Sequence, residues 1–580
     1  MKNSEELRQQ LRSINRKSYP AYKGLKGLYH FGNYILSIDH VQGDPFASPS
    51  HVSIQISHRD AGFPVEYYKD TLTGTTLCDY LTRQFEKQVS QYSFRAKGSG
   101  KSGLLTVSHC GQEILSRTAC EITEKGITAR FFVGFPANGR TINATELEKI
   151  LFDFLPVCIQ KSFFYSSLNA KELQNYIELA EDQEFIRQTL PAKNLCAFIA
   201  DGSILPRESG ISSRPMKASV PFTSPDSLRI SINLPHKGKI TGMGIPKGIT
   251  LIVGGGYHGK STLLNALELG VYNHIPGDGR EYVITDATAV KLRSEDGRFI
   301  KDVDISMFIN DLPNKKDTRC FSTLDARGST SQAAGIVESM ESGSHLFLLD
   351  EDTSATNFMV RDAFMQQVIQ REKEPITPFL ERARDLYEKA GISTILVAGS
   401  SGAFFHIADT IIQMDNYVPK DITASVKKLC SQYPLPAVSV TDFQLPHSHR
   451  IMSRPAESSK RLIHNSRGNH SDSGAAKPER LKTRISGTDG FSLGRQEIDL
   501  RYTEQLIDAE QTAALGLLQK YAVEHLADGR RTLPEIVQFL WKNLSLHGLS
   551  FFTENQKISC GYATPRIQEI YACLNRYRGL

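Results

Sequence analysis

The chain has 580 residues and a formal net charge of +5. A chain of this length is expected to form about three to four domains, and so small a net charge indicates no class of partner. Nine cysteines occur without any Cys-x-x-Cys pair, which argues against a zinc knuckle and a disulfide framework. Reduced thiols are therefore the default, so we expect a cytoplasmic protein. No apolar run reaches the ~18 residues that cross a bilayer, so we expect no membrane insertion.

The first 214 residues mix helical and extended patterns. Helical periodicity occurs at 146–155 and 170–179, and a β-rich run occupies 122–135, which predicts an α+β domain. Within it, residues 95–103 (Arg-Ala-Lys-Gly-Ser-Gly-Lys-Ser-Gly) imitate a phosphate-binding loop but lack its first glycine and its preceding apolar strand. Two interpretations remain: a solvated surface turn, or a mobile basic loop that holds a phosphodiester backbone.

A stronger phosphate-loop signal follows the apolar run 249–253 and precedes the apolar helix start at 263–267. Strand, glycine loop and helix in this order form a phosphate cradle, because backbone N–H groups and the helix N-terminus point at the anion. The lysine of such a loop neutralises the β and γ phosphates, and the following serine binds Mg²⁺. The predicted nucleotide residues here are Gly254, Gly255, Gly256, Tyr257, His258, Gly259, Lys260, Ser261 and Thr262, with Ser261 also as a metal ligand.

A second candidate segment, 328–332, reads Gly-Ser-Thr-Ser-Gln and begins a helical pattern that stops at Gly343. Its free N–H groups and hydroxyls suit an anion. The alternative is an ordinary helix N-cap. The predicted anion-contacting side chains are Ser329, Thr330, Ser331 and Gln332.

The apolar run 344–350 predicts a buried parallel strand that ends in two acids, Asp350 and Glu351. In a phosphate-loop ATPase, the acid at this strand end holds Mg²⁺ and its neighbour positions the attacking water. We therefore predict Asp350 as a metal ligand and Glu351 as a catalytic residue together with Lys260. The alternative is a solvated acidic turn after a core strand.

The C-terminal part combines a basic stretch with predicted helices. Residues 445–484 are rich in Ser, His, Gly and basic residues and lack the apolar periodicity of a core. They form either a polar connector or an electrostatic contact with nucleic acid. Amphipathic helices are predicted at 503–521 and 533–544. Further basic residues near the two ends are Arg8, Arg12, Arg16, Lys17, Lys23, Lys26, Arg566, Arg576 and Arg578.

Taken in order, these motifs resemble the ABC-type ATPases. Ser329 and Gln332 match the superfamily's Leu-Ser-Gly-Gly-Gln signature, with Thr330 and Ser331 in place of its two glycines. Residues 350–357 look like the family's Asp-Glu-Pro-Thr-Ser-Ala-Leu-Asp, and 393–398 and 408–415 look like its last strands. Where many members place a histidine on the γ phosphate, this chain has Ser400, which the resemblance makes a nucleotide contact.

A more specific resemblance is to an uncharacterised group of predicted ATPases of the ABC class. It rests on residues 41–47 (Val-Gln-Gly-Asp-Pro-Phe-Ala), 254–262 and 575–578 (Asn-Arg-Tyr-Arg), and it runs the length of the chain. The implied fold class is α/β, an ABC-type P-loop ATPase core with an N-terminal α+β domain and a mainly helical C-terminal region. The expected domains are 1–214, a core at 215–425, a basic connector at 426–484 and a C-terminal region at 485–580.

The resemblance implies a function with ATP and Mg²⁺ as cofactors. Two copies would form a head-to-tail homodimer in which the signature segment of one protomer closes over ATP bound by the other, and hydrolysis would reopen it. We expect this ATPase cycle to be coupled to binding or remodelling of RNA or DNA through the basic segments. Two alternatives are a nucleotide-gated binding module with little turnover, which Ser400 favours, and the ATPase subunit of a transporter. A small-molecule kinase would leave residues 329–332 without a role.

Overall fold

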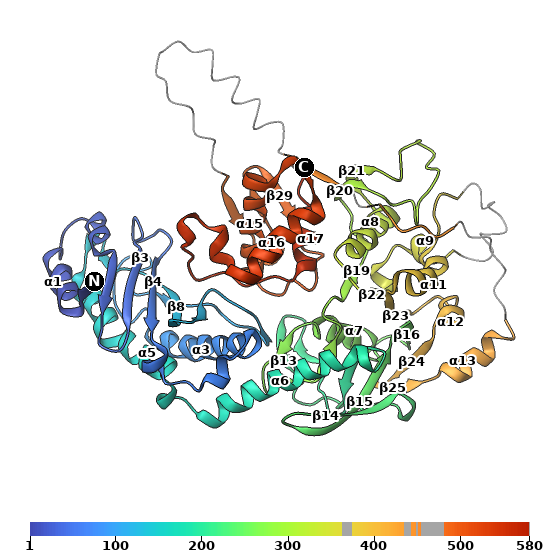
Figure 1. Cartoon of the computed structure of the whole chain (residues 1–580), viewed down its shortest axis with the longest axis horizontal. Coiled ribbons are helices and arrows are strands. Elements are labelled where there is room, and N and C mark those ends of the chain that lie inside the picture. The colour runs from blue at the N-terminus through green and yellow to red at the C-terminus, as the bar shows by residue number, and fades with distance from the viewer. Residues whose placement is uncertain (362–373, 434–441, 448–449, 454–480, 579–580) are drawn as a thin grey trace, which may run out of the picture. The chain divides into compact units, whose positions relative to one another are not determined.

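The computed structural model describes residues 1–361, 374–433, 442–447, 450–453 and 481–578 (Figure 1). They form two compact units. Unit 1 comprises 1–184, 273–277 and 553–564, and unit 2 comprises the described residues of 185–272, 278–552 and 565–580. The expected boundary at 214/215 therefore falls inside unit 2, and the expected C-terminal region contributes residues to both units.

Unit 1 is built on one mixed sheet whose strands pair in the order β1-β2-β3-β4-β8-β5, with β7 also pairing with β8. The strands are β1 (Lys2–Asn3), β2 (Gly27–His30), β3 (Ile35–His40), β4 (Ser50–Ile56), β5 (Leu105–Thr106), β7 (Cys120–Thr123) and β8 (Gly126–Val133). Only β1 and β2 pair in parallel. Alternate residues of β8 are buried, as the two-residue period of a strand requires when one face meets a core.

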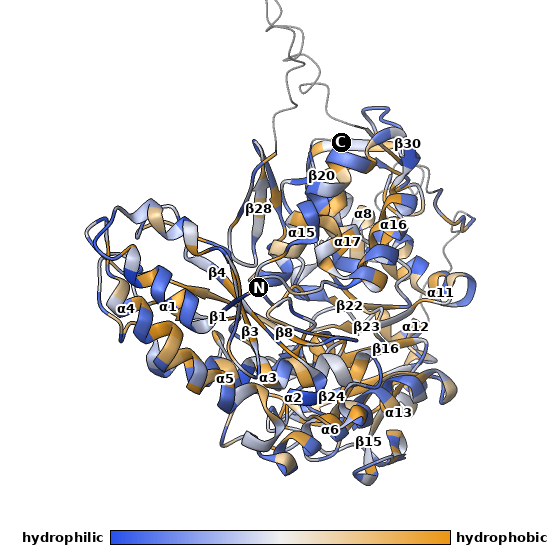
Figure 2. Cartoon of the chain, turned by 60° about the vertical axis from the view of Figure 1, so that its left-hand side comes forward, coloured by the Kyte–Doolittle hydropathy of each residue, from blue (hydrophilic) through white to orange (hydrophobic). Residues whose placement is uncertain are grey.

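Helices complete the core of unit 1. They are α1 (Ser4–Ser13), α3 (Thr71–Tyr92), α4 (Ala144–Glu148), α5 (Leu155–Phe163) and α6 (Ala170–Ala192), whose last residues continue into unit 2. Phe85 of α3 lies with its ring centroid 5.1 Å from those of Phe131 on the sheet and Phe163 on α5. Figure 2 shows both hydrophobic and hydrophilic colours around helices such as α1 and α5, because one face meets the core and the other meets solvent. The predicted α+β character is confirmed.

Residues 553–564 belong to unit 1 although they lie near the end of the chain. The Tyr562 carbonyl accepts a hydrogen bond from the Thr118 N–H at 2.9 Å, and the Thr564 N–H donates to the Ser116 carbonyl at 2.8 Å. No local sequence pattern indicates that this late segment folds with the N-terminal unit.

Unit 2 contains a six-stranded sheet in the order β19-β22-β23-β16-β24-β25. Its strands are β16 (Ile249–Val253), β19 (Val290–Leu292), β22 (Leu346–Asp350), β23 (Ser393–Val397), β24 (Thr410–Asp415) and β25 (Val418–Asp421). All neighbours pair in parallel except β24 and β25. Every residue of β22 and β23 is buried, as expected for parallel strands that are covered on both faces.

A second, antiparallel sheet of unit 2 has the order β14-β15-β11-β18. Its strands are β11 (Leu195–Ala200), β14 (Arg229–Leu234), β15 (Gly238–Pro246) and β18 (Val283–Thr285). Helix α7 (Lys260–Leu269) contacts β18 of this sheet and β22 and β23 of the other. The P-loop helix is thus held between two sheets, and this arrangement fixes where its N-terminus points.

Further helices pack on the six-stranded sheet. Helix α8 (Gly328–Glu341) contacts β19 and the hairpin strand β20 (Arg298–Val303), which pairs with β21 (Phe321–Ala326). Helices α11 (Phe379–Ala390) and α12 (Phe404–Ile407) contact β16, and α13 (Thr423–Cys430) contacts β24. These helices keep both faces of the parallel strands out of water.

The C-terminal part of unit 2 combines helices with a small sheet. It contains β27 (Thr483–Ile485), β28 (Gly490–Leu493), β29 (Gln496–Asp499), α15 (Ala509–Tyr521), β30 (Asp528–Thr532), α16 (Leu533–His547) and α17 (Ile567–Asn575), and β30 pairs with β26 (Ile451–Ser453). Helix α16 begins after a capping box formed by Thr532 and Glu535. Helix α15 begins at its Asp508 cap rather than at the predicted 503, because residues 504 and 505 bond to the core. No helix among the described residues is long and apolar enough to cross a bilayer.

Candidate nucleotide site

The loop between β16 and α7 has a backbone that only glycine fits at two positions. Gly254 has a φ of +143°, and a Cβ there would lie 2.4 Å from the Met414 carbonyl oxygen. Gly259 has a φ of +99°, and its Cβ would lie 2.8 Å from the Tyr417 ring. A residue with a side chain would be strained by its φ and would also clash with its neighbours. These two glycines thus fix the shape of the loop that the sequence predicted as a phosphate cradle.

We expect Gly254→Ala to abolish nucleotide binding, because the loop must move away from Met414. The strain is expected to cost about 1–3 kcal/mol of stability, which chemical denaturation measures, while titration with a fluorescent ATP analogue measures binding. Gly256→Ala is the matched control, since a Cβ added there would have no atom within 4 Å and its φ is not positive. Gly210→Ala is a second control outside the loop, because a Cβ added there also meets no atom within 4 Å and its φ is not positive. Nucleotide binding by Gly254→Ala equal to that of Gly210→Ala would contradict this role of the loop.

Lys260 is the first residue of α7 and folds back over the loop. Its Nζ donates hydrogen bonds to the Gly254 carbonyl at 2.7 Å and to the Gly255 carbonyl at 2.9 Å. Helix α7 has no side-chain N-cap and no acidic residue in its first turn, which leaves its first N–H groups available to an anion. Ser261 in that turn is exposed. The geometry suits a phosphate group placed between the ammonium and the helix N-terminus.

Two other loop residues differ in their surroundings. The Nδ1 atom of His258 accepts a hydrogen bond from the Asn416 N–H at 2.9 Å, and its carbonyl accepts one from the Tyr417 N–H at 3.1 Å. His258 thus ties the loop to the turn between β24 and β25. Tyr257, with a φ of 65°, is 99% exposed. Its ring is therefore accessible to a ligand or a partner protein at the loop.

The sheet register brings the acid strand to the same edge as this loop. Asp350, the last residue of β22, lies opposite Val397 of β23, and Val397 lies opposite Ile252 of β16. The carboxyl ends of β22, β23 and β16 therefore share one edge, where ligands of open α/β sheets bind. Asp350 ends β22, and Ser400 and the P-loop follow the ends of β23 and β16. The register thus brings Ser400 to the same edge as Gly254, although the two lie far apart in the chain.

Asp350 combines burial with a free carboxylate face. It is 8% exposed, and its Oδ1 accepts a hydrogen bond from the Asp352 N–H at 3.1 Å. Burial raises the pKa of this carboxyl above its ordinary value. No cluster of three or more His, Cys, Asp or Glu side chains in the described part of the chain could hold a metal alone. Mg²⁺ commonly takes one or two protein oxygens, with phosphate and water completing its shell, so Asp350 and Ser261 fit such a site.

Glu351 is held by the loop that follows the next strand. Its Oε2 accepts hydrogen bonds from the Gly399 N–H at 2.7 Å and from the Ser400 N–H at 2.9 Å. Two backbone donors on one oxygen fix the direction of the carboxylate and leave its other oxygen available. The sequence pointed to Glu351 and Ser400 separately, and the structure brings them into direct contact through the Ser400 backbone.

The start of α8 is bonded to the segment that follows the acid strand. Ser329 Oγ donates to Asn357 Oδ1 at 2.8 Å, and Gln332 bonds through Nε2 to Ser354 Oγ and through Oε1 to the Ala355 N–H, both at 2.9 Å. Helix α8 and the end of β22 are therefore linked rigidly.

The four signature side chains are not equally accessible. Ser331 and Gln332 are 0% exposed, Ser329 is 8% exposed, and Thr330 is partly exposed. Ser331 Oγ accepts a hydrogen bond from the Glu295 N–H at 2.9 Å and donates to the Gly328 carbonyl at 2.8 Å. The expectation that all four side chains reach a nucleotide is therefore corrected. Ser331 and Gln332 face the interior of their own protomer, because each has hydrogen-bond partners there.

The basic residues named from the sequence fall into three groups. Arg8 and Arg12 share an ion pair with Glu148. Arg450 and Arg576 are buried and Arg566 is partly buried, and they pair with Glu341, Glu295 and Glu569 respectively. Arg16, Lys17, Lys23 and Lys26 are exposed. Most of the predicted basic connector lies outside the described residues, including Arg454, Lys460, Arg461, Arg467, Lys477 and Arg480. The expected basic C-terminus is thus wrong for Arg566 and Arg576, whose charges are neutralised internally.

The loop at 95–103 is ordered by backbone hydrogen bonds. The Ser99 N–H donates to the Ala137 carbonyl at 2.7 Å, and the Lys101 N–H donates to the Pro45 carbonyl at 2.8 Å. The Gly103 N–H donates to the Gly134 carbonyl at 2.9 Å. Of the two interpretations, these hydrogen bonds favour the surface turn over the mobile loop. The turn is packed on two neighbouring segments and presents Arg95 and Lys97 at the surface.

Three family models match the chain. One, for the P-loop domain of ABC ATPases, matches residues 169–448, and one described as the N-terminal part of ATPases of the ABC class matches 4–166. One described as the MRB1590 C-terminal domain matches 482–580. The uncharacterized protein MJ1628 of Methanocaldococcus jannaschii is 30% identical over 266 residues, which are 43% of this chain. The chain spans only 58% of the length of that relative.

Parts of the chain are also similar to solved structures of ABC proteins. The ATP-binding cassette MJ1267 of an ABC transporter, in its ADP conformation, is 12% identical with a TM-score of 0.23 and covers 33% of this chain and 88% of its own. A bacterial Atm1-family ABC exporter with ATP bound is 13% identical with a TM-score of 0.23 and covers 42% of this chain and 43% of its own. The two ABC-class family models together match nearly all of residues 4–448. The chain belongs to the ATPases of the ABC class.

Proposed function

We propose that the protein binds Mg-ATP at the loop 254–262 and hydrolyses it in a head-to-tail homodimer. The observation that carries this proposal is the convergence of three strand ends on one edge of the sheet, which follows from the register of Asp350, Val397 and Ile252. Ser261 and Asp350 would hold Mg²⁺, which would neutralise negative charge on the phosphates.

Each residue of the site has a distinct role in this proposal. Lys260 leaves the Gly254 and Gly255 carbonyls and pairs with the phosphates. The N–H groups at the start of α7 donate hydrogen bonds to the phosphate oxygens. Ser261 and Asp350 provide the metal ligands. Glu351, oriented by two backbone N–H groups, accepts a proton from the attacking water.

In the dimer, the start of α8 of one protomer covers the triphosphate of the other. The contacts come from the N–H groups of its first turn and from Thr330, because Ser331 and Gln332 have internal partners. Ser329 joins them once its hydroxyl leaves Asn357, to which it donates in the protomer. Ser331 and Gln332 hold the helix at the angle that this contact needs. ATP thereby joins two protomers, and hydrolysis separates them.

A nucleotide-gated module with little turnover is the second candidate function. It is favoured by the position of Ser400, which presents its backbone N–H to Glu351 where many ABC-type ATPases carry a histidine for the γ phosphate. ATP-dependent dimerisation without phosphate release would support this function over hydrolysis.

We further propose that the ATPase cycle is coupled to RNA or DNA. The support comes from a basic surface of unit 1 near the loop 95–103. Arg16 and Lys17 are exposed and bond through their backbones to Ile142, in the segment that follows Ala137 and Arg140. Exposed Phe46, 62% accessible, adjoins the same loop, since a Cβ on Gly100 would lie 2.9 Å from its ring. Cations beside an exposed aromatic ring suit a single-stranded nucleic acid.

Binding to labelled RNA across a salt series tests this coupling. We expect Lys97→Ala with Lys101→Ala to weaken binding and to reduce the salt slope by about 0.7 for each lost phosphate contact. Lys125→Ala with Lys161→Ala is the control, because it removes two charges from other exposed positions of unit 1. Absence of RNA binding at low salt, or equal loss in the control, would contradict the proposed surface. ATP hydrolysis with and without total RNA then measures the coupling itself.

A further inference from the structure

The C-terminal part of unit 2 bonds to both helices that carry the candidate nucleotide residues. Two anchors are among the contacts that make this connection. The α7 anchor is formed by Glu504 and Gln505, and the α8 anchor is formed by Arg576. Both belong to the last hundred residues of the chain, yet they reach strands and helices of the ATPase core.

In the α7 anchor, Gln505 is inserted between the end of α7 and the start of β19. It is 3% exposed, and its Nε2 donates to the carbonyls of Glu268 at 3.0 Å and of Ala289 at 3.1 Å. Its Oε1 accepts a hydrogen bond from the Lys291 N–H at 3.1 Å. One side chain thus satisfies three backbone groups from two elements, so those elements cannot shift independently without leaving buried groups unpaired.

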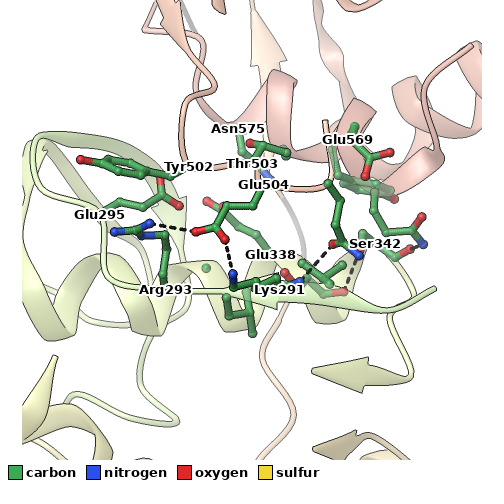
Figure 3. A pocket seen from close by; sticks show the side chains of 18 of the residues that line it. Lys291, Arg293, Glu295, Glu338, Ser342, Tyr502, Thr503, Glu504, Glu569 and Asn575 are labelled. Atoms are coloured by element: carbon green, nitrogen blue, oxygen red, sulfur yellow. Dashed lines mark hydrogen bonds and ion pairs between the residues drawn. The ribbon is translucent and has the colours of Figure 1, made fainter. Parts of the chain in front are cut away.

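Glu504 adds a chain of charges to the same anchor. Its carboxylate pairs with Lys291 and, at 2.8 Å, with Arg293, and Lys291 also pairs with Glu268 at 3.0 Å. Figure 3 shows Glu504 pointing at both cations, and all three side chains line a cavity of about 50 Å³. Burial raises the pKa of the Glu268 carboxyl, which Lys291 opposes. Glu268 lies in the last turn of α7, so Glu504 is connected through Lys291 to the helix that begins at the P-loop.

The α8 anchor reaches the other end of the site. Arg576 pairs with Glu295 Oε1 at 2.5 Å, and the Glu295 N–H donates to Ser331 Oγ at 2.9 Å in the first turn of α8. Burial acts to raise the pKa of Glu295, but Arg576 and Arg298 hold it below its ordinary value, so the carboxyl stays charged. Arg298 also pairs with Glu338 in the middle of α8. Arg576 therefore supports α8 through Glu295, whose N–H group donates to the buried Ser331.

The relative placement of α7 and α8 matters for a symmetric head-to-tail dimer. In such a dimer each nucleotide lies between the α7 N-terminus of one protomer and the α8 N-terminus of the other. A twofold axis repeats the same contact twice. Each protomer contributes α7 to one site and α8 to the other. Both sites can therefore close at the same time only when the distance between α7 and α8 within a protomer matches the distance between the two nucleotides. A buried, hydrogen-bonded charge network is suited to fix such a separation, since it tolerates few alternative geometries.

We propose that Glu504, Gln505 and Arg576 are positioning residues of the ATPase, which hold α7 and α8 at the separation that lets both sites of the dimer close. This role rests on the proposed head-to-tail dimer. It differs from ordinary packing in one respect: losing an anchor impairs dimer closure more than nucleotide binding by a single protomer.

Glu504→Gln and Arg576→Gln in the full chain test the proposal. Each is made in a Glu351→Gln parent, whose ATP-bound dimer is expected to persist. A fluorescent ATP analogue at dilute protein measures binding by the monomer, and light scattering measures the ATP concentration that gives half-maximal dimer. We expect monomer binding within about twofold of the parent and an ATP requirement for dimerisation raised about tenfold. In the wild-type background, the Hill coefficient of hydrolysis is expected to fall from near two toward one.

Two further variants separate positioning from loss of fold. Glu497→Gln removes an exposed carboxylate from the same part of the chain and is expected to behave as the parent. Glu295→Gln with Arg576→Gln removes one charge of each sign from the buried network, and Arg298, which also pairs with Glu295, keeps its pair with Glu338. It should fold and still dimerise poorly.

The outcomes distinguish this role from the proposed function. If the parent dimerises with ATP and the anchor variants dimerise as readily, the positioning role is wrong and the dimer stands. If monomer binding and dimerisation fall in equal proportion, the anchors only stabilise the fold and the role is again wrong. A parent that stays monomeric with ATP would overturn the dimer and this role together.

Discussion

Glu351→Gln is expected to bind ATP, to form a long-lived dimer and to hydrolyse ATP about 10²–10⁴-fold more slowly than the wild type. The side chain keeps its size, and its amide oxygen can still accept the two N–H groups of Gly399 and Ser400. It can no longer take a proton from the attacking water. Phosphate release measures turnover, and size-exclusion chromatography with ATP measures the dimer.

Glu388→Gln is the matched control for this variant. Glu388 lies on α11 of the same unit, and its side chain is 60% exposed, so the change removes one carboxylate remote from the strand ends. Its turnover and dimerisation are expected to equal those of the wild type. Unchanged turnover in Glu351→Gln would remove the catalytic assignment. If the wild type itself releases little phosphate and still dimerises with ATP, the gating function is favoured over hydrolysis.

The parts of the site that could be predicted are those whose chemistry lies in one short segment. The P-loop requires glycine at positions 254 and 259 because of a local backbone shape, and a lysine and a serine directly after it. These features are contiguous, so the sequence alone indicates them. The acid strand is equally local, since an apolar run that ends in Asp350 and Glu351 marks the carboxyl end of a buried strand.

The orientation of the α8 start could not be predicted in the same way. Sequence similarity placed Ser329 to Gln332 together, but the direction of each side chain depends on partners elsewhere in the chain. Gln332 bonds to Ser354 and Ala355, and Ser331 bonds to Glu295. A helix places successive residues about 100° apart around its axis, so adjacent signature residues necessarily face different surroundings.

Charge was the least predictable property from composition. Arg576 was expected in a basic tail, yet it pairs with Glu295, 281 positions earlier in the chain. Arg450 similarly pairs with Glu341 on α8. The sequence shows that a basic residue is paired only when its acidic partner is close in the chain, as for Arg8 and Glu5. Distant partners make a count of basic residues a poor guide to a basic surface. The anchors Glu504 and Gln505 gave no sequence signal, because a single polar pair before a helix resembles any loop.

Lys260→Ala is expected to lose nucleotide binding while keeping its fold. Two charge-assisted hydrogen bonds from the ammonium to phosphate oxygens contribute about 1.5–3 kcal/mol each, so affinity for ATP is expected to fall about 10²–10⁴-fold. Titration with a fluorescent ATP analogue measures this loss. Lys260→Arg keeps the charge but not the compact ammonium that sits over the Gly254 and Gly255 carbonyls, so partial binding is expected.

The stability of Lys260→Ala separates a binding defect from a folding defect. Without nucleotide, Lys260 bonds only to two loop carbonyls that are partly or fully accessible to water. Water can replace the ammonium there, so the free energy of unfolding should change by less than about 1 kcal/mol. With ATP at a hundredfold excess over its dissociation constant, the wild type gains about 2.7 kcal/mol, and the variant gains almost none. An equal gain in both proteins would show that the phosphates lie elsewhere, and the loop 254–262 would then not be the nucleotide site.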